Sequence, residues 1–148
     1  MLLAQRWSVD RVLAVALAGA ESIAVGRREH VCDVLRVSTA PGLGFSDSDQ
    51  LALFIDRDQR LIRRMRFTLN GLEKTRGAVA ELDAYDHVTL HGVCWPTRFH
   101  ERLLRPFPLA VHDWRLTGLD VDRGLDTAEM NGIVFEGKAT APAGSLAL

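Results

Sequence analysis

The chain contains little cysteine, because only Cys32 and Cys94 occur among its 148 residues. Two cysteines do not build the disulfide framework of a small secreted domain, and neither has the C-x-x-C or Cys/His spacing of a metal site. An unpaired cysteine in a protein interior behaves as a small hydrophobic side chain, which favours two free thiols. A single disulfide stays open for the case that the chain is exported and the two strands are adjacent.

Long hydrophobic runs and a large net charge are also missing. No stretch reaches the roughly 20 apolar residues of a membrane-spanning helix. The net charge is −1, whereas a general nucleic-acid binder needs a strongly positive surface. There is no P-loop, no Rossmann glycine pattern, no G-x-S-x-G and no zinc signature. We therefore expect no cofactor, no metal and no nucleic-acid partner.

What is present is the composition of an ordinary globular domain, with 47% hydrophobic and 25% charged residues. A chain of 148 residues is long enough for one domain with a single core. The central stretch, residues 51–69, has two apolar runs on either side of a polar segment, which predicts two antiparallel strands and a tight turn. In the second run, alternation places Leu61, Met65, Phe67 and Leu69 on a covered face and Ile62, Arg64, Arg66 and Thr68 on a face that meets water.

Arg63 is the exception to this pattern, because alternation places it on the apolar face beside Met65. A buried arginine demands a partner, for which a carboxylate or a lipid phosphate would serve. The neighbouring arginines are typical of a solvated face, partly offset by Asp56 and Asp58.

Residues 1–20 admit two interpretations. Ser8 as N-cap, apolar residues at helical spacing and Gly19 near the end favour an amphipathic helix. Alternatively, Arg6 and Arg11, the apolar run and the small residues that follow have the parts of a secretory signal. With a structural helix the expected compartment is the cytoplasm.

The rest of the chain is rich in strand and turn patterns and has no internal repeat. Residues 39–49 are expected to form a loop, and residues 138–148 a poorly ordered tail. We expect six or seven strands in meander order, among them residues 22–25, 31–38, 78–90, 93–104 and 111–121. The predicted class is α+β, a curved antiparallel β-sheet or half-barrel with an N-terminal helix on one face. We expect all 148 residues to form one domain, with the sheet over 21–124.

The order of these features resembles a known family. The matching pieces are ESIAVGRREHVCDVLRV, LALFIDRDQRLIRRMRF, LDAYDHVTLHGVCWPTRF and VHDWRLTGLDVDRGLD. They are similar to the strand and turn order of the LolA-like and LolB-like lipoprotein carriers. Such carriers have several more strands on the amino-terminal side, so the resemblance covers the carboxy-terminal part of their fold.

The resemblance implies an unclosed, strongly curved sheet whose concave face holds acyl chains, and a periplasmic location. The residues that it implies for the apolar lining are Met65, Phe67, Trp95, Phe99, Trp114 and Leu116, and Arg63 joins them as a ligand-binding candidate. Aromatic rings suit such a lining, because they offer a large area at a low entropic cost. The expected partner is a lipid or another apolar ligand, held without catalysis.

Other interpretations stay open. The same apolar face is typical of a plain hydrophobic core. A small barrel-like enzyme would use a His/carboxylate pair, of which Glu101 and His112 are the first to test if their strands are neighbours. His87 and His91 lie roughly 13 Å apart on a strand, too far for one metal ion. A third interpretation is a protein that self-associates through an exposed sheet edge or face into a homo-oligomer.

Overall fold

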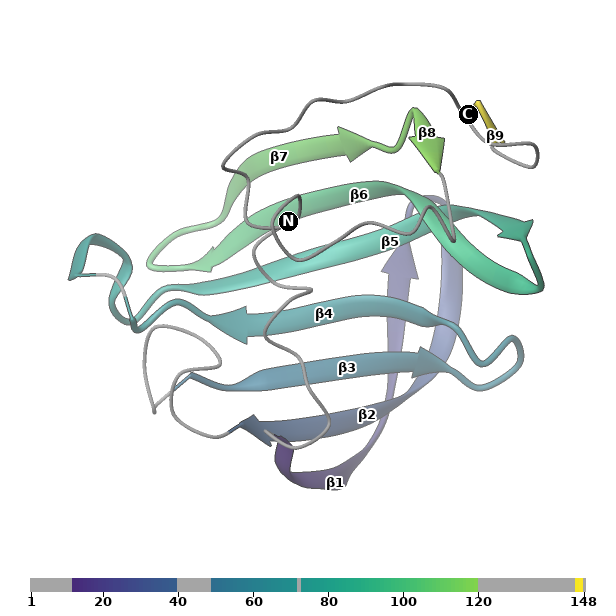
Figure 1. The fold of residues 1–148 in the computed structure, drawn as a ribbon. Helices are drawn as coiled ribbons and strands as arrows, with labels where there is room; N and C mark the ends of the chain where they lie inside the picture. Colours follow the sequence, from purple (N-terminus) through teal and green to yellow (C-terminus); the bar gives the residue numbers. More distant parts are fainter. Residues whose placement is uncertain (1–11, 40–48, 72, 120–145, 148) are drawn as a thin grey trace, which may run out of the picture.

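The main sheet of the protein is an antiparallel meander. The computed structural model describes residues 12–39, 49–71, 73–119 and 146–147. A seven-stranded sheet has the order β1-β2-β3-β4-β5-β6-β7, and a two-stranded sheet pairs β8 with β9 (Figure 1). The elements are β1 (Val12–Val25), β2 (Arg28–Thr39), β3 (Leu51–Asp56), β4 (Ile62–Thr68), the 3-10 helix η3 (Glu73–Thr75), β5 (Val79–Leu90), β6 (Val93–Arg105), β7 (Leu109–Arg115), β8 (Gly118–Leu119) and β9 (Leu146–Ala147).

The strand hairpins are as the turn signals predict. Two-residue turns join β1 to β2 at Gly26 and β5 to β6 at His91 and Gly92, all three with positive φ, as tight hairpin turns require. The sheet is not closed into a barrel, since its order begins at β1 and ends at β7. Both cysteines are free, Cys32 in β2 and Cys94 in β6, so the predicted free thiols are confirmed. The predicted loop and tail lie largely outside the described residues, at 40–48 and 138–145.

The predicted N-terminal helix is wrong. Residues 12–25 form β1, and no α-helix occurs in the part of the chain that the structure describes. Nearly every residue from Val12 to Ala20 is apolar or glycine, so the sequence fits helical and strand periods alike. β1 pairs with β2 from Val12–Thr39 to Val25–Arg28. This pairing satisfies the backbone hydrogen-bonding groups of residues 12–25 and so favours the strand over the helix. The N-cap candidate Ser8 lies outside the described residues.

The two faces of the sheet differ because β1 and β2 bend over one of them. Residues 28–31 of β2, before Cys32, pair only with β1. The arm that these strands form runs behind β3 to β5 in Figure 1. The covered side, here called the inner face, carries Phe54, which is fully buried, and Arg64. The core on this face consists of Ile23, Val25, Cys32, Val34 and Phe54.

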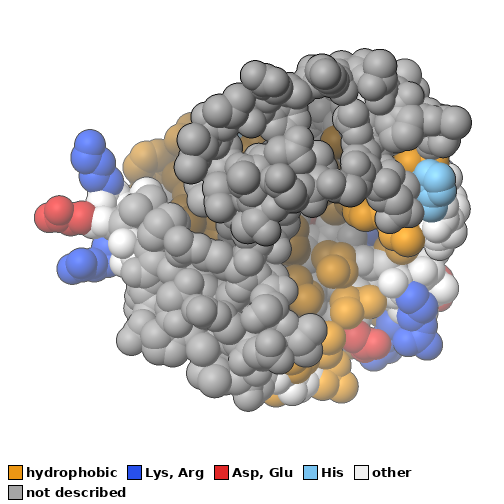
Figure 2. All heavy atoms as spheres, in the orientation of Figure 1, with side chains coloured by type: hydrophobic (Ala, Val, Ile, Leu, Met, Phe, Trp, Pro, Cys, Tyr) orange, Lys and Arg blue, Asp and Glu red, His pale blue; other side chains and the backbone are white. Residues whose placement is uncertain are grey.

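The outer face carries the other set of side chains, and it is the apolar one. Across successive strands Leu53, Met65 and Leu82 are register partners, and Phe99 pairs with Trp114. Figure 2 shows hydrophobic side chains on this side of the molecule. The expectation that Arg64 meets water is wrong, since its side chain on the inner face is only 8% exposed.

Candidate functional site

A cavity of about 790 Å³ is lined by residues 18–21 of β1 and by residues of β2 to β6. Most of the β2 to β4 lining belongs to the inner face, and Val37, Leu51 and Phe67 belong by register to the outer one. Four residues of β1 border it, and three of them, Ala18, Gly19 and Ala20, have side chains too small to fill the space. The register with β2 shifts between Leu17 and Gly19, and Gly19 has a φ of 124°, a conformation that side chains disfavour. Small residues at a bulge therefore leave a hollow where larger ones would close the core.

The cavity combines an apolar floor with charged groups. Its apolar lining includes Val34, Leu51, Ala52, Phe54, Val79 and Leu104. Its charged lining consists of Glu21 from β1, Arg36 from β2, Arg66 from β4 and Arg105 from β6. The lining exposes somewhat more polar than apolar surface, so the cavity is more polar than a typical ligand pocket, which has a mostly apolar wall and a few polar groups.

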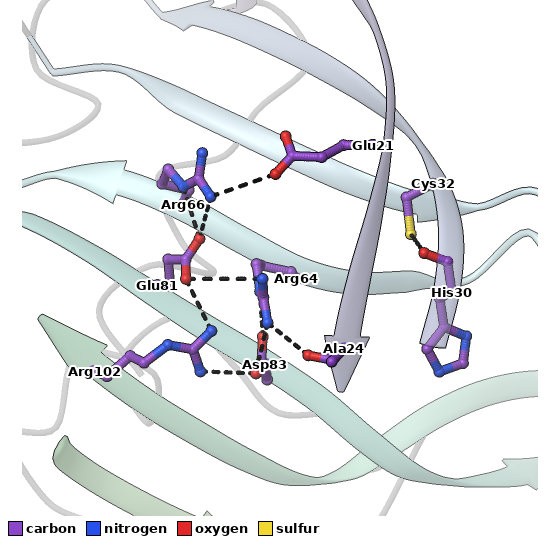
Figure 3. A network of polar contacts seen from close by, with 9 residues as sticks. All are labelled: Glu21, Ala24, His30, Cys32, Arg64, Arg66, Glu81, Asp83 and Arg102. Carbon is purple, nitrogen blue, oxygen red and sulfur yellow. Dashed lines mark hydrogen bonds and ion pairs between the residues drawn. The ribbon is translucent and has the colours of Figure 1, made fainter. Parts of the chain in front are cut away.

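One of the four charged residues, Arg66, is held by a buried carboxylate. Its Nη2 lies 2.5 Å from Oε2 of Glu81 (Figure 3). Its guanidinium also stacks over the Phe54 ring, 5.0 Å from the ring centroid. Glu21 lies 4.0 Å from the same guanidinium. The position of Arg66 on the cavity wall is therefore fixed from two sides.

The carboxylate that holds Arg66 belongs to a larger inner-face network. Arg102 donates to both Glu81 and Asp83 at 2.8 Å, and Arg64 donates to Asp83 at 2.5 Å through Nε. Arg64 also donates to the carbonyl oxygen of Ala24 at 2.9 Å, which ties the arm to the sheet. We call Glu21, Arg64, Arg66, Glu81, Asp83 and Arg102 the charge network; its three cations and three anions cancel.

A second polar cluster surrounds Asp56 at the end of β3. Its carboxylate accepts from the backbone N–H groups of Asp58 and Gln59, from His30 Nδ1 at 2.5 Å and from Arg63 Nε at 3.3 Å. Burial disfavours the charged carboxylate and by itself would raise the pKa of Asp56. The hydrogen bonds have the larger effect and lower this pKa to about 2. Asp56 is therefore ionised throughout the physiological range.

Arg63 joins this cluster instead of the apolar face, so that expectation is wrong. A β-bulge between Phe54 and Ile55 makes Arg63 the extra residue of β4 and turns it toward Asp56. The predicted need for a carboxylate partner is confirmed. Arg63 also donates to Gln59 and, at 3.2 Å, to Nδ1 of His87, whose pKa is lowered by burial and by the arginine charge.

The other predicted ligand residues lie apart from the cavity, with one exception. Only Phe67 is among the cavity lining. Met65, Phe99 and Trp114 belong to the outer face, where Trp114 is 50% exposed. Trp95 lies in β6 and donates through Nε1 to the carbonyl of Leu90 at 3.4 Å, while Leu116 follows β7.

The strands of the predicted His/carboxylate pair are neighbours. Glu101 and His112 are register partners on β6 and β7, and Nδ1 of His112 lies 2.8 Å from Oε2 of Glu101. The imidazole also stacks on Trp114, with the ring centroids 5.2 Å apart. His112 is exposed on the edge strand β7, so it can reach a molecule in solution.

Sequence reasoning missed the charge network, although a signal for it exists. Arg64 and Arg66 alternate along one strand, and Glu81 and Asp83 alternate along the next. Complementary charges at the same spacing on two neighbouring strands predict cross-strand ion pairs.

Comparison of this chain with protein-family models, with curated proteins and with solved structures gives no match. Among the described residues, no helix is long and apolar enough to span a membrane, and no three His, Cys, Asp or Glu side chains are grouped as a metal site would need.

Proposed function

We propose that the protein is a non-enzymatic binding module for a lipid or another ligand with an apolar body, which it holds on the inner, concave side of its curved sheet. The observation that carries the proposal is the cavity of about 790 Å³ with Val34, Ala52 and Phe54 in its lining. Its volume lies in the range of roughly 300 to 1,000 Å³ typical of small-molecule sites. The resemblance to LolA-like and LolB-like carriers leads to the same proposal.

The binding energy of such a ligand needs no specific polar contact. Each methylene group removed from water contributes about 0.8 kcal/mol, so burying even part of an acyl chain in the cavity gains a few kcal/mol. The small side chains of Ala18 and Ala20 keep the space open on the β1 side. The neighbouring charge network keeps β1 in place over the cavity through Glu21 and the carbonyl of Ala24.

Native mass spectrometry of the purified protein tests the proposal. We expect an apolar ligand to survive desalting, or a neutral apolar dye such as N-phenyl-1-naphthylamine to bind one site per chain. A ligand-free monomer that also fails to bind the dye contradicts the proposal. A mass at a multiple of 16.4 kDa would support the alternative of self-association.

A substitution that fills the cavity tests the location of the binding site more directly than the mass measurement. Ala52 lines the floor, so Ala52→Leu is expected to weaken dye binding by more than about tenfold, as extra methylenes do in a filled pocket. Stability should be unchanged or higher, because the added carbons enter an existing hollow. Ala110→Leu, the same change on the exposed strand β7, is the control and should bind the dye as the parent does. Equal binding by both variants would place the ligand elsewhere.

A small enzyme acting on an apolar substrate is the alternative, favoured by the Glu101–His112 contact of 2.8 Å. In that case His112→Ala abolishes turnover. Because His112 is exposed, the free energy of unfolding of the variant should lie within about 1 kcal/mol of that of the parent. For a binding module we expect the opposite outcome, with His112→Ala retaining the dye affinity of the parent.

A further inference from the structure

We infer that the ligand of this cavity is an amphiphile with a negatively charged head, a carboxylate or a phosphate monoester, which Arg36 and Arg105 hold at the rim. The inference rests on the proposed function and specifies its ligand class. Both arginines line the cavity, and both are exposed, whereas the floor residues Val34 and Phe54 are buried. An extended molecule with its tail on the floor therefore has its head among the guanidinium groups.

The charge balance favours an anion. The charge network is neutral by itself, so Arg66 and Glu21 on the cavity wall contribute no surplus. Arg36 and Arg105 form no ion pair with any residue in the described ranges. Asp49 lies next to the lining through its hydrogen bond with Thr68, and with its charge included the described residues of the rim still carry a positive charge.

Guanidinium groups suit this role because they bind carboxylate and phosphate oxygens through two parallel hydrogen bonds. Arg36 comes from β2 and Arg105 from the end of β6, strands that are not neighbours in the sheet. Three strands, β3, β4 and β5, lie between them, so each arginine offers a guanidinium group at its own part of the rim. Polar neighbours at the same rim are Gln50 and Thr68.

Displacement of the neutral dye by single-chain amphiphiles tests the inference. The four competitors are dodecanoate, dodecyl phosphate, dodecanol and dodecyltrimethylammonium at slightly alkaline pH, the ionic ones below their micelle concentrations and dodecanol below its solubility limit. We expect at least one of the two anions to compete at about tenfold lower concentration than dodecanol, the effect of a charge-assisted hydrogen bond in a half-exposed site. The better anion identifies the head group. The advantage should shrink at high salt.

The rim arginines are tested by charge removal. Arg36→Gln and Arg105→Gln should each weaken the binding of the preferred anion severalfold, the size of effect expected for an exposed to half-buried ion pair. The affinity for dodecanol should stay unchanged. Arg27→Gln is the matched control, because Arg27 is exposed in the turn between β1 and β2, outside the cavity lining. An equal loss in Arg27→Gln would mean that only net charge matters, which overturns the inference.

The failures of the two proposals are distinguishable. If dodecanol displaces the dye as well as both anions do, or if the cationic amphiphile is preferred, the anionic head group is wrong and the binding module stands. If neither the dye nor any amphiphile binds, or if Ala52→Leu binds them as the parent does, the proposed function is wrong, and the inference falls with it.

Discussion

Replacing Glu81 by glutamine is expected to lower the free energy of unfolding by about 3 to 5 kcal/mol. Glu81 is 3% exposed and accepts hydrogen bonds from Arg66 at 2.7 Å and from Arg102 at 2.8 Å. Glutamine has nearly the same shape, but it is neutral and has only one acceptor oxygen. The change leaves the charge network with three cations and two anions, and water compensates least at Arg64, whose side chain is 10% exposed.

Glu21→Gln is the matched control for this variant. Glu21 lies 4.0 Å from the same Arg66 guanidinium, but its side chain is 49% exposed. Exposed ion pairs contribute about 0 to 1 kcal/mol to the free energy of unfolding. Glu21→Gln should therefore unfold at nearly the same urea or guanidinium concentration as the parent. If both variants lose the same small amount, the interior of the network is not shielded from water.

A double variant separates the pairwise interaction from the loss of a buried charge. In Glu81→Gln combined with Arg102→Gln, one cation leaves together with one anion. The combined cost should therefore be smaller than the sum of the two single costs, by roughly 0.5 to 3 kcal/mol, as for residues in direct contact. Additive costs would contradict a shared network.

Strand hairpins follow from local signals in this chain, which is why most of the sheet can be predicted from the sequence. Alternation and turn residues predict β3, β4, β5 and β6 to within a residue at each end. β1 is different, because a run of apolar and small residues has no distinctive period. Its strand conformation comes from pairing with β2, and pairing partners are a property of the whole fold.

The cavity was less predictable, because it depends on which face the arm covers. Large apolar residues at alternate positions, such as Met65 and Phe67, mark a face as suitable for burial. They do not reveal that Arg64 and Arg66, on the opposite face, find Glu81 and Asp83 under the arm. Once paired in this way, charged side chains occupy an interior that periodicity assigns to water. The hollow itself arises from Ala18, Gly19 and Ala20, which carry no periodic signal.

Asp56→Asn is expected to cost about 3 to 5 kcal/mol at neutral pH, the second large effect. Asparagine keeps one acceptor for the backbone N–H groups of Asp58 and Gln59, so the turn after β3 should persist. The loss falls on Arg63, which is 7% exposed and then has no carboxylate partner among the described residues. Asp58→Asn, an exposed change in the same turn, is the control and should stay within about 0.5 kcal/mol of the parent.

The dependence on pH distinguishes the charge of Asp56 from its shape. The pKa of Asp56 in the folded chain is about 2, below the value of 3.8 for a free side chain. The unfolded chain therefore takes up this proton first as the pH falls, and the stability that ionised Asp56 contributes is present above about pH 4 and disappears toward pH 2. Asparagine cannot titrate, so the difference in unfolding free energy between the parent and Asp56→Asn should narrow across that window. A difference that stays constant down to pH 2 would mean that the variant acts through packing, and that the carboxylate charge does not hold Arg63 in place.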